Sequence, residues 1–538
     1  MPTITFAKAD LEKALGRSIN EKILERISFL GMPVEHVDDK EIVIEVSPNR
    51  PDVLSLHGFS RAMRSFLGIK IGLQKYTAKP SSYKVIIDKQ VQQVRPFTVC
   101  AVVKGLKLTD EKIRELIDLQ EKVHITFGRN RKKIALGIYP LEKIKFPIRY
   151  TAKKPEDIEF FPLEINKKLT ANQILALHPT GRKYAHLLEG QKLYPLFIDA
   201  KNQIMSMPPI INSNTVGKID LQTKEVFIEC SGFDFSYLSK SLNMIVAALI
   251  DMGGVAYQVT LQYVTKKVTP QLEPERMKLD PAYAEKILGV PLKPAQVKIL
   301  LERMGFGYDG KTASIPSYRA DILHPIDLVE DIAIAYGYEN IPEKIPHVAT
   351  IGKEDAAAVY ENKIRDVLTG YGLLEVKNFS LTNKKEQQEM VLQNRPVLEI
   401  ENAFSEEYSV LRRSFLPSLL ATLKRNKHNE FPQHIFEIGT VFKDDCKEER
   451  RLCIALCNTD TDFTKIKQIL DGLMQALNKP FVLEEAKDYA SFINGRVAIV
   501  KVNNVNVAHI GEVHPQVLTN FELEMPVAVL EMNLELMK

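Results

Sequence analysis

Residues 316–338 read PSYRADILHPIDLVEDIAIAYGY and contain the most informative pattern in the chain. A short strand is expected to end near residues 319–321, followed by a turn through a His-Pro pair and a helix that begins near Asp327. Leucine, valine and isoleucine residues supply the apolar face of this helix, and Gly337 is placed to end it. The stretch therefore predicts a strand–turn–helix unit.

Four carboxylates gather in this unit. On the expected helix three of them fall at i, i+3 and i+4 and so share one face, and the fourth precedes the helix. Carboxylates that converge repel one another unless a cation lies among them, and an all-oxygen set suits Mg²⁺. From the residues alone, a solvated acidic first turn favoured by the helix dipole is the alternative. The candidate ligands are Asp321, Asp327, Glu330 and Asp331.

The composition is that of an ordinary globular protein. The chain has 538 residues, which is too long for a single core, so about three to five domains are expected. Hydrophobic residues make up 45% and charged residues 26%. The net charge of +4 is too small to indicate nucleic-acid binding from the overall balance, so any basic surface must be local.

No targeting or membrane signal is expected in this chain. The N-terminus lacks a basic segment followed by an apolar run. The longest apolar candidate, residues 244–250, is interrupted by Asp251 and a glycine pair, and is too short to span a bilayer. The five cysteines are scattered without the spacing of a disulfide framework or a zinc site. A cytoplasmic protein with no membrane association is therefore expected.

Hydrophobic periodicity and turn signals divide the chain into four modules that mix helices and strands, so the predicted fold class is multidomain α+β. The first, an α/β module, opens with helical patterns at residues 8–15 and 20–29 and a strand at 42–46. The third has two helices and a strand in an arrangement similar to a winged helix, and the fourth is a mixed antiparallel domain. The expected boundaries are 1–85, 86–268, 270–346 and 350–538.

The first module contains the segment SPNRPDVLSLHGFSRAMRSFLGI at residues 47–69. Two prolines bracket a turn that holds Arg50 and Asp52, and a helix is expected from about Leu54. An Asn-Arg pair before a helix can form a ligand loop. A buried Arg50–Asp52 pair that fixes the turn is the interpretation that the local sequence favours.

This segment is similar to the N-terminal signature of the β subunits of phenylalanyl-tRNA synthetases, in their archaeal and eukaryotic form. Residues 316–342, which begin with PSYRADI and end with GYENIP, resemble the magnesium-binding segment of the same family. The order and spacing of the intervening elements also match, so the resemblance covers essentially the whole chain. It implies that the four carboxylates bind Mg²⁺ and that this ion stiffens a domain or subunit contact.

The resemblance implies that the second module edits tRNA by hydrolysing tyrosine wrongly esterified to tRNA(Phe). A pocket shaped for phenylalanine cannot strongly reject a side chain that merely adds a hydroxyl, so a second site must read that hydroxyl. Glu229 is the candidate acceptor of the phenol proton, and the other polar residues orient the ester and a water. Without the family, these are ordinary strand-end polar residues. The implied pocket residues are Phe197, Ser206, Asn212, Glu229 and Ser231.

Two polar loops of the second module carry clustered positive charge. One is the run RNRKK at residues 129–133, and the other is HPTGRK at residues 178–183. Taken alone, such loops are usually solvated turns. Beside a polynucleotide they are candidate phosphate contacts.

The last module resembles the class II aminoacyl-tRNA synthetase catalytic fold, with two departures. A working site needs an arginine shortly before a glutamate on a central strand to hold the α-phosphate of ATP, but here the strand reads HIFE, ending at Glu437. It also needs a glycine-rich junction ending in arginine near the C-terminus, where this chain reads VAVLEMNLELMK. Without these cations the module is not expected to adenylate an amino acid.

The resemblance implies the β subunit of an α₂β₂ phenylalanine–tRNA ligase. The partners are then an α subunit and tRNA(Phe), and the holoenzyme uses ATP at a site on α, while this chain contributes editing and Mg²⁺. Two alternatives from other classes are a stand-alone editing hydrolase and a non-catalytic nucleic-acid-binding protein. Deacylation without α would favour the first, and salt-dependent binding to duplex DNA would favour the second.

Overall fold

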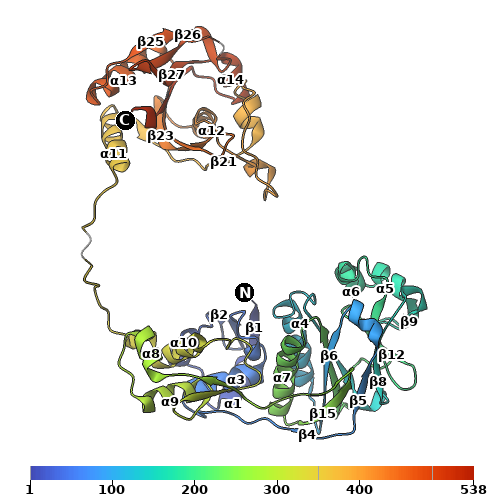
Figure 1. The fold of residues 1–538 in the computed structure, drawn as a ribbon. Coiled ribbons are helices and arrows are strands. Elements are labelled where there is room, and N and C mark those ends of the chain that lie inside the picture. Colours follow the sequence, from blue (N-terminus) through green and yellow to red (C-terminus); the bar gives the residue numbers. More distant parts are fainter. Residues whose placement is uncertain (1, 349–350, 488, 538) are drawn as a thin grey trace. The chain divides into compact units, whose positions relative to one another are not determined.

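The computed structural model describes residues 2–348, 351–487 and 489–537 and separates the chain into two compact units, Met1–Ile345 and Pro346–Lys538 (Figure 1). Residues 1, 350 and 538, which bound expected modules, lie outside the described ranges. The boundary between the units falls at the end of the third expected module. The three modules before it share one cluster of buried apolar residues that runs from Ile4 to Ala335.

The N-terminal part confirms the helices and the strand expected there. A three-stranded sheet of order β1-β3-β2 packs with three helices. Asn20 caps the second helix by accepting from the Ile23 N–H, and Gly16 ends the first in a left-handed conformation. The elements are β1 (Thr3–Ala7), α1 (Lys8–Leu15), α2 (Glu21–Phe29), β2 (Val34–Val37), β3 (Glu41–Glu45) and α3 (Leu56–Phe66).

The turn before α3 is held by an ion pair. Arg50 Nε lies 2.9 Å from Asp52 Oδ1, and Arg50 Nη2 lies 3.0 Å from Asp52 Oδ2. Both side chains are buried. This geometry confirms the interpretation of the Asn-Arg segment as a turn fixed by an Arg–Asp pair.

The second part is built on an eleven-stranded sheet, with α4 (Asp110–Ile125) and α7 (Phe235–Asp251) packed on it (Figure 1). The main path runs β13-β12-β11-β8-β5-β15-β6-β14-β7, and β4 and β16 pair with β15. The strands are β4 (Ala78–Lys79), β5 (Lys84–Ile87), β6 (Phe97–Lys104), β7 (Ile134–Pro140), β8 (Ile148–Lys153), β11 (Tyr194–Ile198), β12 (Ile204–Met207), β13 (Ile211–Asn212), β14 (Val226–Gly232), β15 (Val255–Gln262) and β16 (Lys266–Thr269).

The sheet reaches past the expected boundary at residue 85. Strands β4 and β5 pair in parallel with β15, and β5 also pairs in parallel with β8. The second module therefore takes strands from the end of the first. A small satellite of β9 (Glu159–Phe160), β10 (Leu169–Thr170), α5 (Ala171–Leu177) and α6 (Pro179–Tyr184) has its own apolar cluster beside β11 and β12.

The third part contains the strand–turn–helix unit predicted from residues 316–338. Its strand ends earlier than expected, at Ile315, because Pro316 has no N–H to continue the ladder. The helix spans Pro325–Tyr336 and ends at Gly337, whose φ is +94°. The elements are β17 (Glu275–Lys278), α8 (Pro281–Leu288), α9 (Pro294–Arg303), β18 (Gly307–Tyr308), β19 (Thr312–Ile315) and α10 (Pro325–Tyr336), with sheet order β17-β19-β18.

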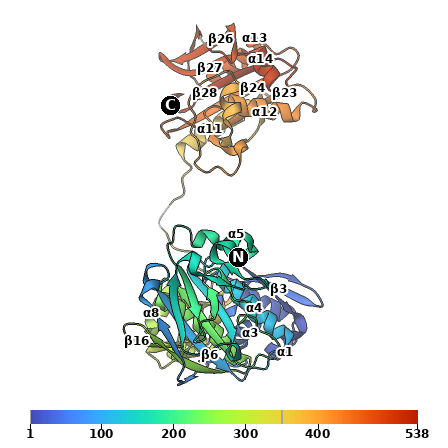
Figure 2. The ribbon, with the colours of Figure 1, turned by 90° about the vertical axis from the view of Figure 1, so that its right-hand side faces the viewer.

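The second unit is built on a seven-stranded sheet (Figure 2). Clusters of buried apolar residues cover both faces of this sheet. Along β24 (Glu448–Cys457), Ile454 belongs to one cluster and its neighbour Ala455 to the other, the alternation of a strand covered on both sides. The sheet order is β20-β23-β24-β28-β27-β26-β25, and only β20–β23 is parallel.

The other elements of this unit are α11 (Ala356–Gly370), β20 (Leu374–Glu375), β21 (Leu381–Thr382), β22 (Val410–Leu411), α12 (Leu416–Asn426), β23 (Gln433–Phe442), α13 (Phe463–Ala476), β25 (Val482–Glu485), β26 (Phe492–Val502), β27 (Val505–Val513), α14 (Pro515–Asn520) and β28 (Val527–Asn533). The mixed, mainly antiparallel domain expected from the sequence is confirmed. Within the described ranges, no helix has the length and apolar character needed to cross a bilayer.

Candidate functional site

Glu229 lies at the centre of the large sheet. It is on β14 between β6 and β7, where its register partners are Cys100 and Gly137, and its side chain is 2% exposed. Gly137 makes room for it, because a Cβ atom at that residue would lie 2.7 Å from Glu229 Oε1. A carboxyl group this deeply buried needs hydrogen-bond partners.

The hydroxyl of Tyr139 supplies one partner. It lies 3.1 Å from Glu229 Oε1 and 3.2 Å from Asn212 Oδ1, and its single proton serves only one of these acceptors at a time. Tyr139 is on β7 and Asn212 is on β13, the two ends of the strand path, so the sheet curls until its ends meet at this contact. Among the described residues, Glu229 Oε2 and Ser206 Oγ are buried and have no hydrogen-bond partner.

The position of Ser206 follows from strand register. Phe197 on β11 lies opposite Ser206 on β12, and Ser206 lies opposite Asn212 on β13. Phe197 and Ser206 are buried, whereas Asn212 is half-buried. The structure therefore brings Glu229, Ser206 and Asn212 to one place, and Asn212 marks the side of the cluster nearest to solvent.

Ser231 is held by a second network next to the first. Its Oγ accepts from Arg95 Nε at 3.1 Å, and its carbonyl oxygen accepts from Arg95 Nη2 at 2.6 Å. The Tyr150 hydroxyl donates to the Arg95 carbonyl at 2.8 Å, and its ring stacks on Phe197 with centroids 4.5 Å apart. Arg95 is buried, and burial lowers its pKa to about 10. Arg95 and Tyr150 thus connect Ser231 to Phe197.

Tyr139, Gly137, Arg95 and Tyr150 were not among the residues predicted from the sequence. Tyr139 lies on β7, but nothing in the local sequence shows that its hydroxyl reaches Asn212, 73 residues away. Arg95 meets Ser231 across 136 residues and carries no motif. Only the folded sheet shows these contacts.

Burial determines whether the carboxyl group of Glu229 is charged. It raises the pKa of Glu229 from 4.5 to about 8, and the Tyr139 hydrogen bond and the positive charge of Arg95 only partly oppose it. Glu229 is therefore mainly protonated at neutral pH. Oε1 faces the Tyr139 hydroxyl, and Oε2 is the buried oxygen without a partner in the described part of the chain. The cluster thus presents a neutral acid and, close to the Tyr139 hydroxyl, the buried Ser206 hydroxyl, a set suited to hydrogen-bonding a polar group of a ligand.

The raised pKa makes the stability of the fold depend on pH. Below pH 4.5 Glu229 is protonated in both states, and between 4.5 and about 8 only the folded state keeps the proton, so stability is lost as pH rises through this range. Relative to the wild type, the Glu229→Gln variant should gain about 1.4 kcal/mol per pH unit there. Urea unfolding of both proteins at several pH values measures this gain, and parallel stability curves would contradict it.

The carboxylate cluster of α10 is arranged around an arginine. Arg319 Nη2 lies 2.7 Å from Asp321 Oδ2 and 2.6 Å from Asp331 Oδ2, and its side chain is 2% exposed. Burial alone would lower the pKa of Arg319, but Asp331 and Asp321 hold it well above its ordinary value. Two of the four candidate metal ligands therefore already have a cation between them.

The other two candidates point elsewhere. Asp327 Oδ2 accepts from the backbone N–H groups of Leu323 and His324, both at 2.7 Å, as part of the helix cap. Glu330 is exposed. In the part of the chain that the structure describes, no three His, Cys, Asp or Glu side chains gather closely enough to hold a metal ion. As placed, the four residues do not fit a Mg²⁺ site, and their assignment to the metal stays a prediction.

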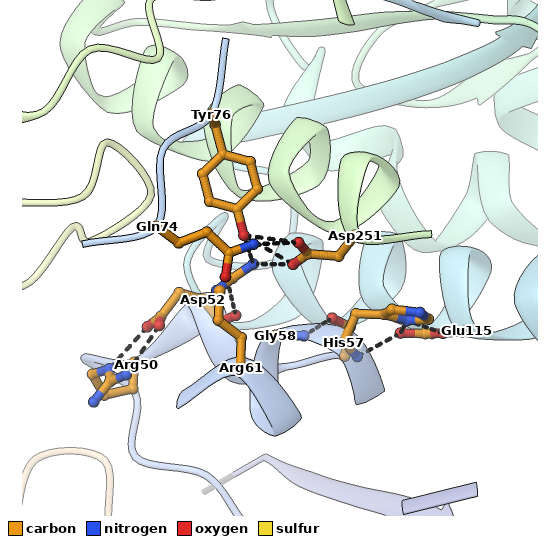
Figure 3. Close-up of polar contacts among 10 residues, drawn as sticks. Arg50, Asp52, His57, Gly58, Arg61, Gln74, Tyr76, Glu115 and Asp251 are labelled. Carbon is orange, nitrogen blue, oxygen red and sulfur yellow. Dashed lines mark hydrogen bonds and ion pairs between the residues drawn. The ribbon is translucent and has the colours of Figure 1, made fainter. Parts of the chain in front are cut away.

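Polar contacts also join the N-terminal part to α4 and α7 (Figure 3). Asp251, at the end of α7, accepts from Arg61, Gln74 and Tyr76 at 2.5–3.1 Å. The ring of His57 on α3 lies 3.0 Å from Glu115 on α4. A cavity of about 1270 Å³ lies among these groups. These hydrogen bonds and ion pairs connect the first module to the second.

In the second unit, Glu437 is paired with an arginine from another segment. Arg412 Nη1 donates to Glu437 Oε1 at 2.7 Å and Arg412 Nε donates to the Thr440 carbonyl at 2.9 Å. Both charged side chains are almost completely buried, at 1% and 0% exposure. The guanidinium of Arg412 is therefore already hydrogen-bonded inside the second unit.

The comparisons with known proteins first define the class. Residues 277–338 match the model of the tRNA synthetase B5 domain, and residues 341–534 match that of the phenylalanyl tRNA synthetase beta chain CLM domain. A chain with both domains is a subunit of an aminoacyl-tRNA ligase.

The particular family follows from full-length relatives. The phenylalanine–tRNA ligase beta subunit of Pyrococcus abyssi is 39% identical over 99% of this chain and 98% of its own length. That of Archaeoglobus fulgidus is 37% identical over the same shares. A crystal structure of an N-terminal fragment of the phenylalanyl-tRNA synthetase beta subunit from Pyrococcus horikoshii is 35% identical, with a TM-score of 0.60, and the match covers 62% of this chain and 99% of the fragment. The chain belongs to the family of phenylalanine–tRNA ligase beta subunits.

Proposed function

We propose that, within this ligase, the cluster around Glu229 edits tRNA(Phe) by hydrolysing tyrosine esters. The observation that supports the proposal most strongly is the pair of buried atoms without partners, Glu229 Oε2 and Ser206 Oγ. Buried polar atoms of a native fold are normally hydrogen-bonded, and each unpaired one indicates a missing partner. A phenol hydroxyl of a bound tyrosine would satisfy both by accepting from one and donating to the other.

Discrimination against phenylalanine follows from the same two atoms. A phenylalanine side chain entering the cluster has no hydroxyl, so Glu229 and Ser206 would stay buried and unpaired. A site that hydrogen-bonds a substrate hydroxyl rejects the analogue without it much more strongly than an apolar pocket rejects an added hydroxyl. The cluster would therefore retain Tyr-tRNA(Phe) and release the correct product.

The hydrolytic step needs a water placed against the ester carbonyl. The water oxygen bonds to the carbonyl carbon and the ester bond to the ribose breaks. One water proton ends on the released ribose hydroxyl, and the other is lost to solvent as the released tyrosine carboxyl group ionises. Ser231 and Asn212 are the residues we assign to orienting the ester and the water. Arg95 holds Ser231 in place through two hydrogen bonds and acts as a positioning residue.

Activation of phenylalanine is assigned to a partner. The occupied state of Arg412 supports a second unit that does not bind the α-phosphate of ATP, because its guanidinium already contacts Glu437. We therefore place ATP and phenylalanine on an α subunit, with this chain in an α₂β₂ assembly in the cytoplasm. A stand-alone editing hydrolase would show deacylation but no association with α.

Two assays on the purified full-length chain test this proposal. The chain should deacylate Tyr-tRNA(Phe) faster than Phe-tRNA(Phe), since only the tyrosyl ester satisfies both unpaired atoms. It should show no phenylalanine-dependent ATP–pyrophosphate exchange until an α subunit is added. Equal rates for the two esters would refute the editing site, and exchange by the chain alone would refute the assignment of activation to α.

A further inference from the structure

The two basic segments of the second module, residues 129–133 and 178–183, meet in the fold. The first is a turn before β7, as expected, whereas the second, expected as a loop, is helical: His178 caps α6 and residues 179–183 lie within it. Both segments are called the basic loops below. The guanidinium carbon of Arg131 lies 4.4 Å from the centre of the Tyr184 ring, and Tyr184 is the last residue of α6, the helix that carries the second loop. Glu121 on α4 fixes Arg131 from the other side through an ion pair of 2.7 Å. Arg131 thus holds the loops together.

The same arginine also contacts the wall of the editing cluster. Arg131 Nη1 donates to the carbonyl of Ile210 at 2.8 Å. Ile210 lies in the short connection between β12 and β13, the strands that carry Ser206 and Asn212. The basic loops therefore border the cluster on the side of Asn212, its half-buried member.

The first loop keeps an unusual backbone. Arg129, Asn130 and Arg131 have φ values of +47°, +53° and +64°, and a left-handed conformation costs free energy at residues other than glycine. Backbone hydrogen bonds hold the turn closed, among them Lys133 N–H to the Gly128 carbonyl at 2.9 Å. Strained backbone of this kind occurs mainly where a surface must be presented in a fixed shape.

The charges that these segments expose have no acidic partner among the described residues. We name this surface the basic rim: Arg129, Lys132, Lys133, Arg182 and Lys183, all exposed. None of the five takes part in an ion pair in the described ranges, although other exposed lysines and arginines do. The ammonium groups of Lys133 and Lys183 lie over the rings of Tyr237 and Tyr184, which leaves their charge unneutralised. Five positive charges next to one site form a strong local field in a chain whose net charge is only +4.

We infer that the basic rim binds the phosphodiester backbone of tRNA beside the aminoacylated end. An ester bound at Glu229 brings the last nucleotides of the tRNA to the outside of the cluster, where the rim supplies unpaired cations for their phosphates. The location next to the ester rests on the proposed editing function, whereas the affinity for phosphates rests on the free charges alone. The rim contributes no base-specific contact, so it acts on any tRNA that reaches the cluster.

The double variant Lys132→Gln/Arg182→Gln tests the inference, because it removes one charge from each loop and, within the described ranges, neither side chain makes a hydrogen bond, ion pair or ring contact. Binding of uncharged tRNA(Phe) to the full-length chain is measured by filter binding at several potassium chloride concentrations. The slope of log K against log salt should fall by about 2, one for each lost phosphate contact, and the affinity at low salt should drop roughly tenfold.

Lys278→Gln/Lys286→Gln is the matched control, because it removes the same charge from exposed residues of the third part that also lack ion pairs. An unchanged slope in the rim variant, or an equal fall in the control, would overturn the inference. Deacylation of Tyr-tRNA(Phe) is measured in parallel. If the wild-type chain fails to deacylate Tyr-tRNA(Phe), the editing proposal is refuted. If the salt dependence of tRNA binding still falls in the rim variant, the inference that the rim binds phosphates stands.

Discussion

Glu229→Ala is expected to lower the rate of Tyr-tRNA(Phe) deacylation roughly 10⁴-fold, the lower end of the range by which a site built to hydrogen-bond a substrate hydroxyl rejects the analogue without it. The reason is that Glu229 Oε2 is the buried, unpaired group that faces the substrate hydroxyl in the proposed site. Single-turnover deacylation with the full-length chain in excess over labelled Tyr-tRNA(Phe) measures the loss. Phenylalanine attachment by the complex with α should stay at the wild-type rate.

Two further variants keep this prediction decisive. Glu229→Leu keeps a similar volume and has no polar atom to meet a substrate hydroxyl, so it should fold and still lose most of the activity. Glu225→Ala is the matched control, because Glu225 lies just before the same strand and pairs with Lys104 on the neighbouring one. A Glu229→Leu variant that folds and keeps wild-type deacylation would remove this residue from the site.

Arg319→Met is expected to destabilise the first unit by about 3–5 kcal/mol, the usual cost of removing one partner of a buried ion pair. The substitution leaves Asp321 and Asp331 facing each other without the guanidinium that now lies 2.7 and 2.6 Å from them. Calorimetry measures the loss, and hydrogen exchange of the peptide containing α10 locates it. An unchanged transition would contradict the role assigned to Arg319.

The companion variant Arg319→Met/Asp321→Asn/Asp331→Asn should recover much of the lost stability, since it removes the stranded charges as well. Arg276→Met is the matched control, because Arg276 pairs with Asp309 on the surface of the same part. Adding magnesium chloride to Arg319→Met tests the metal prediction separately. A divalent ion among the freed carboxylates would restore stability, and no change would show that these side chains do not retain it.

Local signals in the sequence predicted the short-range structure well. The helix of residues 8–15 and the end of α10 at Gly337 follow from periodicity and from glycines that accept a positive φ. The strand before α10 was predicted four to six residues too long, because its alternation continues past a proline that cannot donate to the ladder.

The contacts that define the sites were less predictable. The sequence places four carboxylates on one stretch but does not show that Arg319, from the same stretch, turns back between two of them. The same holds for Tyr139, whose hydroxyl meets Asn212 only because the sheet curls until its end strands meet. Period and spacing describe single elements, whereas these contacts depend on how distant elements pack.

Strand β5, residues 84–87, has a consequence for how this chain can be cut or recombined. It lies between β8 and β15, so it joins the half of the sheet that carries Ser206 to the half that carries Glu229. A fragment that begins at residue 86 would divide this strand and lose strand pairing between the two halves of the sheet. A gene rearrangement that moves the editing part to another protein must therefore include residues 84–87, which belong to the end of the first module. The two modules are for this reason expected to be inherited together.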